Sequence, residues 1–176
     1  MFARYKKSVL FLLIGMMLWI SGPDHAFAQN MDTPVLLQVA TFVKVFKYDA
    51  TLKDKSSLKL LIVYSSGNKT VKDELLKAFR DASVQVNAAT LDELDGLIHE
   101  YDVIYLMPGV QSASGLCKQH KKLSISGLGR YAQDGLASVA LGLVNDKPRL
   151  FVNLESLQEE GHTLSAKLLQ VVQVFN

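Results

Sequence analysis

The residues that could do chemistry in this chain are few, and their spacing has to be weighed against simpler structural roles. Gly127-Leu128-Gly129-Arg130 joins the backbone N–H groups of a glycine-rich loop to a guanidinium, as an anion-binding loop would. Position 132 is alanine, so the chain lacks the full glycine pattern of a dinucleotide-binding loop. We therefore interpret the glycines mainly as turn residues, and an anion contact at Arg130 is the alternative.

Two other groups of residues could form a site. Ser65 and Ser66 follow an apolar run, at a position where open α/β sheets bind ligands if the run is a strand. Cys117 and His120 form a Cys-x-x-His pair, but two further zinc ligands are not evident from the spacing. The spacing shows no nucleophile with a base beside it. We expect no catalysis, no bound metal and no cofactor.

The remaining reactive or charged residues have structural interpretations as well. Cys117 is the only cysteine, so the expectation is a buried inert thiol, with an intermolecular disulfide as the alternative. His162 follows Gly161 and is interpreted as part of a helix terminus. The basic residues Lys118, Lys121 and Lys122 are interpreted as solvated surface, and a contact with a partner or an anion is the alternative.

The first element that would position these residues is an amphipathic helix. Thr33-Pro34 predicts a helix start, with Thr33 as N-cap and Pro34 at the first helical position. Apolar residues then recur with the helical period as far as Phe46. Phe42 and Phe46 on this stripe are candidate partner contacts, although packing in the core would use the same stripe.

The first half of the chain then alternates between strands and helices. Apolar runs predict strands over residues 58–64, 84–88 and 103–107. Between them, helices are predicted over residues 70–81, capped by Thr70, and 90–100, where Thr90-Leu-Asp-Glu93 matches a capping box. This alternation is typical of a parallel sheet.

The second half predicts a hairpin and terminal helices. After a helix over residues 112–120 come a strand over 122–126, a glycine-rich loop over 127–135 and a strand over 136–144 that pairs with 149–153. Helices over residues 154–160 and 164–175 follow, separated by Gly161. The predicted fold is a single compact α/β domain with a largely parallel central sheet of about five to six strands, flanking helices and a C-terminal β-hairpin plus helices.

The first 28 residues have the three regions of a secretory signal peptide. Arg4, Lys6 and Lys7 precede the apolar run from Val9 to Ile20, and Ala26-Phe27-Ala28 is a small-x-small cleavage site. Cleavage after Ala28 would leave residues 29–176 as one domain in the periplasm. Of 19 basic and 17 acidic residues, the signal holds three and one, so 16 of each remain. A neutral domain gives no argument for binding nucleic acid or an anionic membrane.

The C-terminal third of the chain resembles the YfiR family of small periplasmic proteins. Val152-Asn153-Leu154 stands where members commonly have Ile-Asn-Leu at a strand end, and Gly161, Ser165, Leu168 and Leu169 follow in register. The segment from Gln38 to Phe46 is similar to the opening helix of the family. Physically, Asn153 can cap the helix that follows it, Gly161 can end that helix and Ser165 can begin the next.

The chain departs from the family pattern at several places. It has Tyr48-Asp49 where the family often has Trp-Pro, and only Gly135 where the family often has two adjacent glycines. Leu157 and Val172 replace small residues. The family's disulfide cannot form within a chain that has one cysteine. These differences leave the expected fold intact. The family's partner and its redox response, however, cannot be carried over to this chain.

The resemblance implies a non-catalytic regulatory protein. It implies binding to the periplasmic domain of a membrane-anchored signalling protein, either a diguanylate cyclase, whose restraint would control cyclic di-GMP and biofilm, or a sensor kinase. The alternative is a periplasmic solute- or ligand-binding accessory protein of a sensor kinase or outer-membrane receptor. We also expect a symmetric homodimer as one state of the protein.

Overall fold

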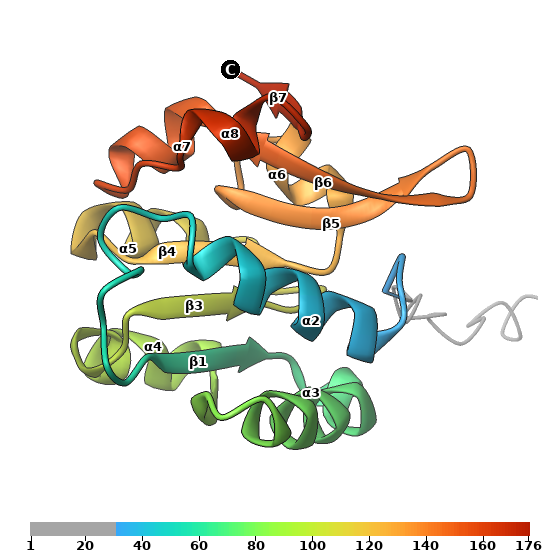
Figure 1. The fold of residues 1–176 in the computed structure, drawn as a ribbon. Helices are drawn as coiled ribbons and strands as arrows, with labels where there is room; N and C mark the ends of the chain where they lie inside the picture. The colour runs from blue at the N-terminus through green and yellow to red at the C-terminus, as the bar shows by residue number, and fades with distance from the viewer. Residues whose placement is uncertain (1–30) are drawn as a thin grey trace, which may run out of the picture.

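The computed structural model describes residues 31–176, so the predicted signal peptide, residues 1–28, lies outside the described residues. Seven strands form one sheet in the order β2-β1-β3-β4-β5-β6-β7. Figure 1 shows this order from β1 through β3, β4, β5 and β6 to β7. The strands are β1 Lys59–Tyr64, β2 Gln85–Thr90, β3 Val103–Leu106, β4 Leu123–Ser126, β5 Val139–Val144, β6 Lys147–Asn153 and β7 Gln173–Phe175. All neighbouring strands pair in parallel except β5 and β6, which form an antiparallel hairpin. The predicted α/β fold with a largely parallel sheet is confirmed.

Helices cover both faces of the sheet, which is why its central strands are apolar throughout. Side chains of α2 and α3 join one core cluster, and side chains of α4, α5 and α6 join a second cluster on the opposite face. The strand β1 is buried along Leu60 to Val63, as a parallel strand between two helical layers must be. The helices are α2 Val35–Phe46, α3 Lys69–Asp81, α4 Leu91–Leu97, α5 Ala113–His120, α6 Gly129–Gln133, α7 Leu154–Glu159 and α8 Ala166–Leu169, with 3-10 turns η1 Ser66–Asn68 and η2 Ile98–Glu100.

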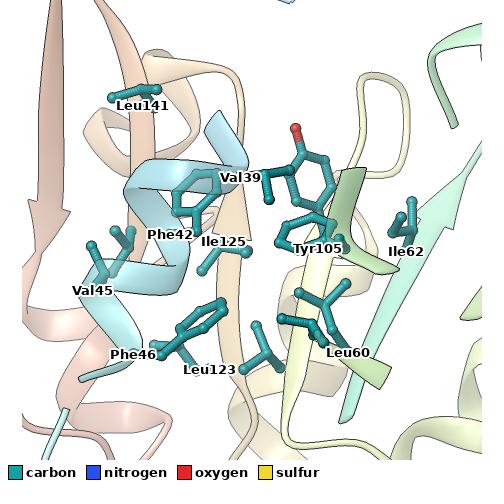
Figure 2. Close-up of a cluster of buried hydrophobic side chains, with 14 of the residues drawn as sticks. Val39, Phe42, Val45, Phe46, Leu60, Ile62, Tyr105, Leu123, Ile125 and Leu141 are labelled. Carbon is teal, nitrogen blue, oxygen red and sulfur yellow. The ribbon is translucent and has the colours of Figure 1, made fainter. Parts of the chain in front are cut away.

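The apolar stripe of α2 packs onto β3, β4 and β5 (Figure 2). Phe42 is 0% and Phe46 is 5% exposed, and the Phe42 ring meets the Tyr105 ring edge to face with centroids 6.0 Å apart. The expectation that Phe42 and Phe46 contact a partner is therefore wrong, because both rings fill the core. The outward face of α2 carries different residues, of which Leu36 is 75% exposed.

Two predicted helix starts are displaced by one residue or more. Pro34 is the N-cap of α2, which begins at Val35, and the Thr33 hydroxyl is buried without a hydrogen-bond partner. Thr70 lies inside α3, because the turn η1 leads directly into that helix at Lys69. At α4 the predicted capping box is present, with the Glu93 carboxylate accepting from the Thr90 backbone N–H at 2.8 Å.

The glycine-rich segment 127–135 was expected to be a loop, but it contains α6. This helix is only five residues long and begins at Gly129, so helix propensity gave no signal for it. It forms because Leu128, Tyr131 and Ala132 are buried against the sheet. Glycine at 129 allows the close approach, since a Cβ there would lie 2.5 Å from the Phe151 ring.

The predicted helix over residues 164–175 is also wrong. Only α8 is helical, and residues Gln173–Phe175 form β7, the seventh strand and one edge of the sheet. The strand pairs with the end of β6, Phe151 opposite Gln173 and Asn153 opposite Phe175. The β-branched residues Val171, Val172 and Val174 favour this extended conformation. The sheet therefore exceeds the five to six strands expected.

Candidate functional site

The first candidate site lies at the carboxyl edge of the parallel strands, where Ser65 and Ser66 follow β1. Ser65 is half-buried, and its Oγ lies 3.4 Å from the carbonyl oxygen of Pro108, which follows the end of β3 by two residues. The Asn68 amide donates to the same carbonyl at 2.9 Å and to Ser65 Oγ at 3.1 Å. Ser66 is exposed on the turn η1. The gap between the ends of β1 and β3 is thus bridged by the chain's own polar groups.

The second candidate site is the glycine-rich segment with Arg130. The Gly129 N–H, one of the donors an anion would need, donates to the Asp32 carboxylate at 3.0 Å. The Leu128 N–H donates to Ser126 Oγ at 3.2 Å. Arg130 is exposed, with its guanidinium 6.0 Å from the centre of the Tyr131 ring. A carboxylate of the same chain therefore occupies the position that the anion interpretation assigned to a ligand.

The basic residues around α5 are largely paired with the chain itself. Lys118 forms a 2.6 Å salt bridge with Glu159, and Lys121 Nζ donates to the Glu159 carbonyl oxygen. Lys122 Nζ donates to the His99 carbonyl oxygen at 3.2 Å, and partial burial lowers the pKa of Lys122. These contacts tie α5 to the end of α7 and to η2, as a structural role requires.

The histidine and cysteine of the Cys-x-x-His pair point to different surroundings. His120 packs edge to face on His99 with ring centroids 4.4 Å apart. Cys117 is fully buried in the core beneath α5, and burial together with the charge of Glu160 raises the pKa of its thiol. In this fold a partner's thiol cannot reach Cys117, which argues against the intermolecular disulfide. Within residues 31–176 no group of three or more His, Cys, Asp or Glu side chains could hold a metal ion.

The family-pattern residues surround the C-terminal helices and organise their ends. Asn153 caps α7 by accepting from the Ser156 N–H at 2.8 Å, and its amide donates to the Ala132 carbonyl at 3.0 Å. Gly161 has φ of +74°, which glycine adopts without strain. Ser165 Oγ accepts from the Leu168 N–H at 3.4 Å at the start of α8. Leu168 and Leu169 pack half-buried against the core of α2 and α3.

Between these residues lies a buried carboxylate that the sequence reasoning missed. Glu160 is 1% exposed and reaches the amino ends of β4 and β5. Its carboxylate accepts from the Ser124 N–H at 2.8 Å and from the hydroxyls of Ser124 and Ser138, both at 2.5 Å. Burial raises the pKa of Glu160 to about 7, although these hydrogen bonds and the charge of His162 act in the opposite direction.

His162, two residues further on, forms the second half of this polar cluster. Its Nδ1 lies 3.0 Å from Asp49 Oδ2, and the two side chains are 4% and 0% exposed. The other oxygen of Asp49 accepts from the N–H groups of Thr51 and Leu52 at 2.8 and 3.0 Å. The backbone of His162 follows the predicted helix terminus, because its N–H donates to the Leu157 carbonyl at 3.0 Å. Its side chain, however, binds a segment more than a hundred residues earlier in the chain.

The cluster joins four parts of the chain: the connection after α2, the amino ends of β4 and β5, and the segment after α7. We use the name polar cluster for Asp49, Ser124, Ser138, Glu160 and His162. Backbone hydrogen bonds reinforce the cluster. The Ala50 N–H donates to the Thr163 carbonyl oxygen at 2.9 Å, and the Ser165 N–H donates to the Tyr48 carbonyl oxygen at 2.9 Å. All five side chains are nearly inaccessible to solvent, so the arrangement suits holding segments together rather than turning over a substrate. The only sequence signal for it was a serine in each of two apolar runs, Ser124 within β4 and Ser138 directly before β5.

Comparisons with solved structures reveal the fold of this domain in bacterial proteins. A conserved domain protein from Vibrio cholerae O1 biovar El Tor matches with a TM-score of 0.60 and 14% identity, over 78% of this chain and 60% of that chain. The ABC domain in complex with L-Trp from Streptococcus pneumonia matches with a TM-score of 0.60 and 16% identity, over 81% and 60%.

A third solved structure is the ligand-free, open form of CD0873 from Clostridium difficile, a substrate-binding protein with adhesive properties. It matches with a TM-score of 0.54 and 14% identity, over 69% of this chain and 55% of that chain. The chain thus spans 55 to 60% of the length of these three structures, and at such identities the likeness shows the fold alone. Among curated proteins no significant match was found.

The resemblance to the YfiR family that the sequence suggests is confirmed by a family profile that covers most of the chain. The profile of the DUF4154 family, described as YfiR/HmsC-like, matches residues 35–173. The match runs from the first residue of α2 to the first residue of β7, so it takes in the whole sheet apart from the last two residues of its edge strand. The chain therefore belongs to the YfiR/HmsC-like family.

Proposed function

We propose that this protein binds the periplasmic domain of a membrane-anchored signalling protein, a diguanylate cyclase or a sensor kinase, and modulates its output. The observation that carries the proposal is the family match over residues 35–173, because this family consists of periplasmic regulatory proteins. The signal-like residues 1–28 support export, followed by cleavage after Ala28. Across residues 31–176 no helix is long and apolar enough to cross a membrane.

The buried polar residues form hydrogen bonds within the chain, which supports a binding role without catalysis. Glu160, His162 and Asp49 are the buried acidic and imidazole groups of the polar cluster, and each is engaged with a neighbour in the chain. A catalytic group must meet its substrate, and these groups are closed to solvent. No cofactor is required for the proposed activity, which consists of protein–protein recognition.

The outward face of α2 is the surface that we propose for the partner. Leu36 and Leu37 are exposed there, and Leu36 is more exposed than any other large apolar residue of the described domain. Lys44 lies on the same side about two turns further on. Exposed apolar residues beside basic ones suit a partner segment that combines apolar and acidic side chains. This surface replaces the Phe42 and Phe46 stripe, which faces the core.

Replacing Leu36 by aspartate is expected to weaken binding to the partner about 30-fold, the size of a hot-spot loss. Stability should change by less than about 0.5 kcal/mol, because the side chain is exposed. Binding is measured by titrating the purified partner domain, and stability by thermal unfolding. Lys53→Asp, at an exposed site in the loop after α2, is the matched control and should bind like the wild type.

The partner itself is sought by affinity capture. Tagged residues 29–176 are incubated with detergent-solubilised membranes of the host, and bound proteins are identified by mass spectrometry with L36D as the comparison sample. A diguanylate cyclase or sensor kinase that is enriched with the wild type and depleted with L36D supports the proposal. Recovery of no membrane signalling protein, from membranes that contain such proteins, contradicts it.

The alternative of a solute-binding accessory protein has less support from the described residues. At its expected site around Ser65, Ser66 and Arg130, Asn68 of the same chain donates to Ser65, and Asp32 accepts from the Gly129 N–H beside Arg130. A ligand that binds the native state raises the unfolding temperature, so a thermal-shift screen of small solutes tests this alternative directly. A symmetric homodimer stays a prediction, checked by light scattering on the same sample.

A further inference from the structure

Residues 160–165 hold the C-terminal segment onto the rest of the domain at two buried charged positions. Glu160 binds the amino ends of β4 and β5, and His162 binds Asp49 just after α2. Leu164 forms an isolated bridge with Asp49, and Ser165 bonds to Tyr48. Beyond this point the chain adds only α8 and the short edge strand β7, which contacts the sheet through β6 alone.

The charges at this position do not cancel. Two carboxylates, Glu160 and Asp49, share a single imidazole, that of His162, in a region closed to water. The other groups near Glu160 are the hydroxyls of Ser124 and Ser138 and the thiol of Cys117 from α5. Nearby Lys118 and Lys121 do not neutralise Glu160, because they bind the side chain and the carbonyl of Glu159 instead. Ionising Glu160 therefore places an excess negative charge in the interior, which is costly.

We propose that the polar cluster is a pH-sensitive latch, closed while Glu160 is protonated and opening more often when Glu160 ionises, so that residues 160–175 detach locally from the domain. Opening would expose the half-buried residues Leu168, Leu169 and Val172 and remove the edge strand β7. The latch belongs to the chain itself and does not depend on the proposed function or on any partner.

The direction follows from proton binding in the two states. Closed Glu160 has a pKa raised to about 7, while in the open segment it returns toward its ordinary value of 4.5. The closed state therefore binds more protons between these values, and its advantage is present at low pH and is lost as the pH rises through about 7. Between pH 5.5 and 8.5 the opening equilibrium is expected to increase about 30-fold.

Hydrogen exchange followed by mass spectrometry tests the latch on the intact domain. After correction for the pH dependence of intrinsic exchange, protection of peptides covering residues 163–175 should fall about 30-fold between pH 5.5 and 8.5. Peptides from the central strands β1 and β3 should not change. The wild-type series alone decides the matter, since pH-independent protection at the C-terminus, or an equal loss in the central strands, overturns the proposal.

Two variants locate the titrating group. Glu160→Gln keeps the size of the side chain but cannot ionise, so protection of residues 163–175 should become independent of pH. Glu155→Gln removes a charge from the exposed side of α7, the helix directly before Glu160, and should keep the wild-type pH dependence. If the Glu155→Gln variant loses the pH dependence or Glu160→Gln retains it, Glu160 is not the group that controls opening.

Discussion

Replacing Gly142 by alanine is expected to destabilise the domain by about 3 kcal/mol, at the upper end for overpacking a core. Gly142 on β5 faces Gly129 of α6 so closely that a Cβ would lie 2.7 Å from the Gly129 Cα and 2.7 Å from the Phe151 ring. The Gly129 nitrogen would lie 3.0 Å away. Backbone atoms cannot rotate aside as a flexible side chain can, so α6 would have to move off the sheet.

The measurement is urea unfolding of Gly142→Ala followed by circular dichroism. Gly96→Ala is the matched control, because Gly96 lies in α4 with nothing within 4 Å of its Cβ position. That variant should be more stable than the wild type by about 0.5 to 1 kcal/mol, since alanine favours a helix over glycine. Wild-type stability for Gly142→Ala would contradict the close packing of α6 on β5.

The parts of the fold that could be predicted are those set by local pattern and burial. The strands β1 and β3 are apolar runs between two helical layers, and α2 has an apolar stripe over three turns. The capping box at Thr90 and Glu93 marks the start of α4 from sequence alone. In each case the residues that form the element also carry the signal for it.

The parts that could not be predicted depend on contacts between distant residues. The five-residue α6 begins with glycine and can pack on the sheet because Gly142 and Gly129 have no side chains where the helix, β5 and the Phe151 ring meet. The strand β7 forms because the end of β6 offers it a free edge, and the same apolar residues also fit a helical period. Local preference cannot distinguish such cases, since tertiary pairing overrides it.

The residues that set the helix ends around the candidate site were predicted from the sequence, but the buried charged residues inside the site were not. Asn153, Gly161 and Ser165 are visible in the sequence through the family pattern, and they set the ends of α7 and α8. Glu160 and His162 lie between them, but their partners are 22 to 113 residues away in the chain. A buried carboxylate and a surface one look alike in a single sequence. Only the fold reveals that Glu160 and Asp49 lie inside the domain.

Asp49 is the position in the polar cluster where a single substitution should cost the most stability. Asp49→Ala is expected to destabilise the domain by about 3 kcal/mol, because it leaves several buried hydrogen-bonding groups without their partner. The loss has two physical sources. His162 stays buried without an acceptor for its Nδ1, and the N–H groups of Thr51 and Leu52 lose the oxygen that they share.

Urea unfolding of Asp49→Ala, beside Asp54→Ala as control, measures this loss. Asp54 lies in the same connection but is exposed, so its removal should change stability by less than about 0.5 kcal/mol. Asp49→Asn keeps an oxygen for Thr51 and Leu52 and should fall between the two. A loss below about 1 kcal/mol for Asp49→Ala would contradict a stabilising role for the buried contact between Asp49 and His162, and with it the attachment of the C-terminal segment to the connection after α2.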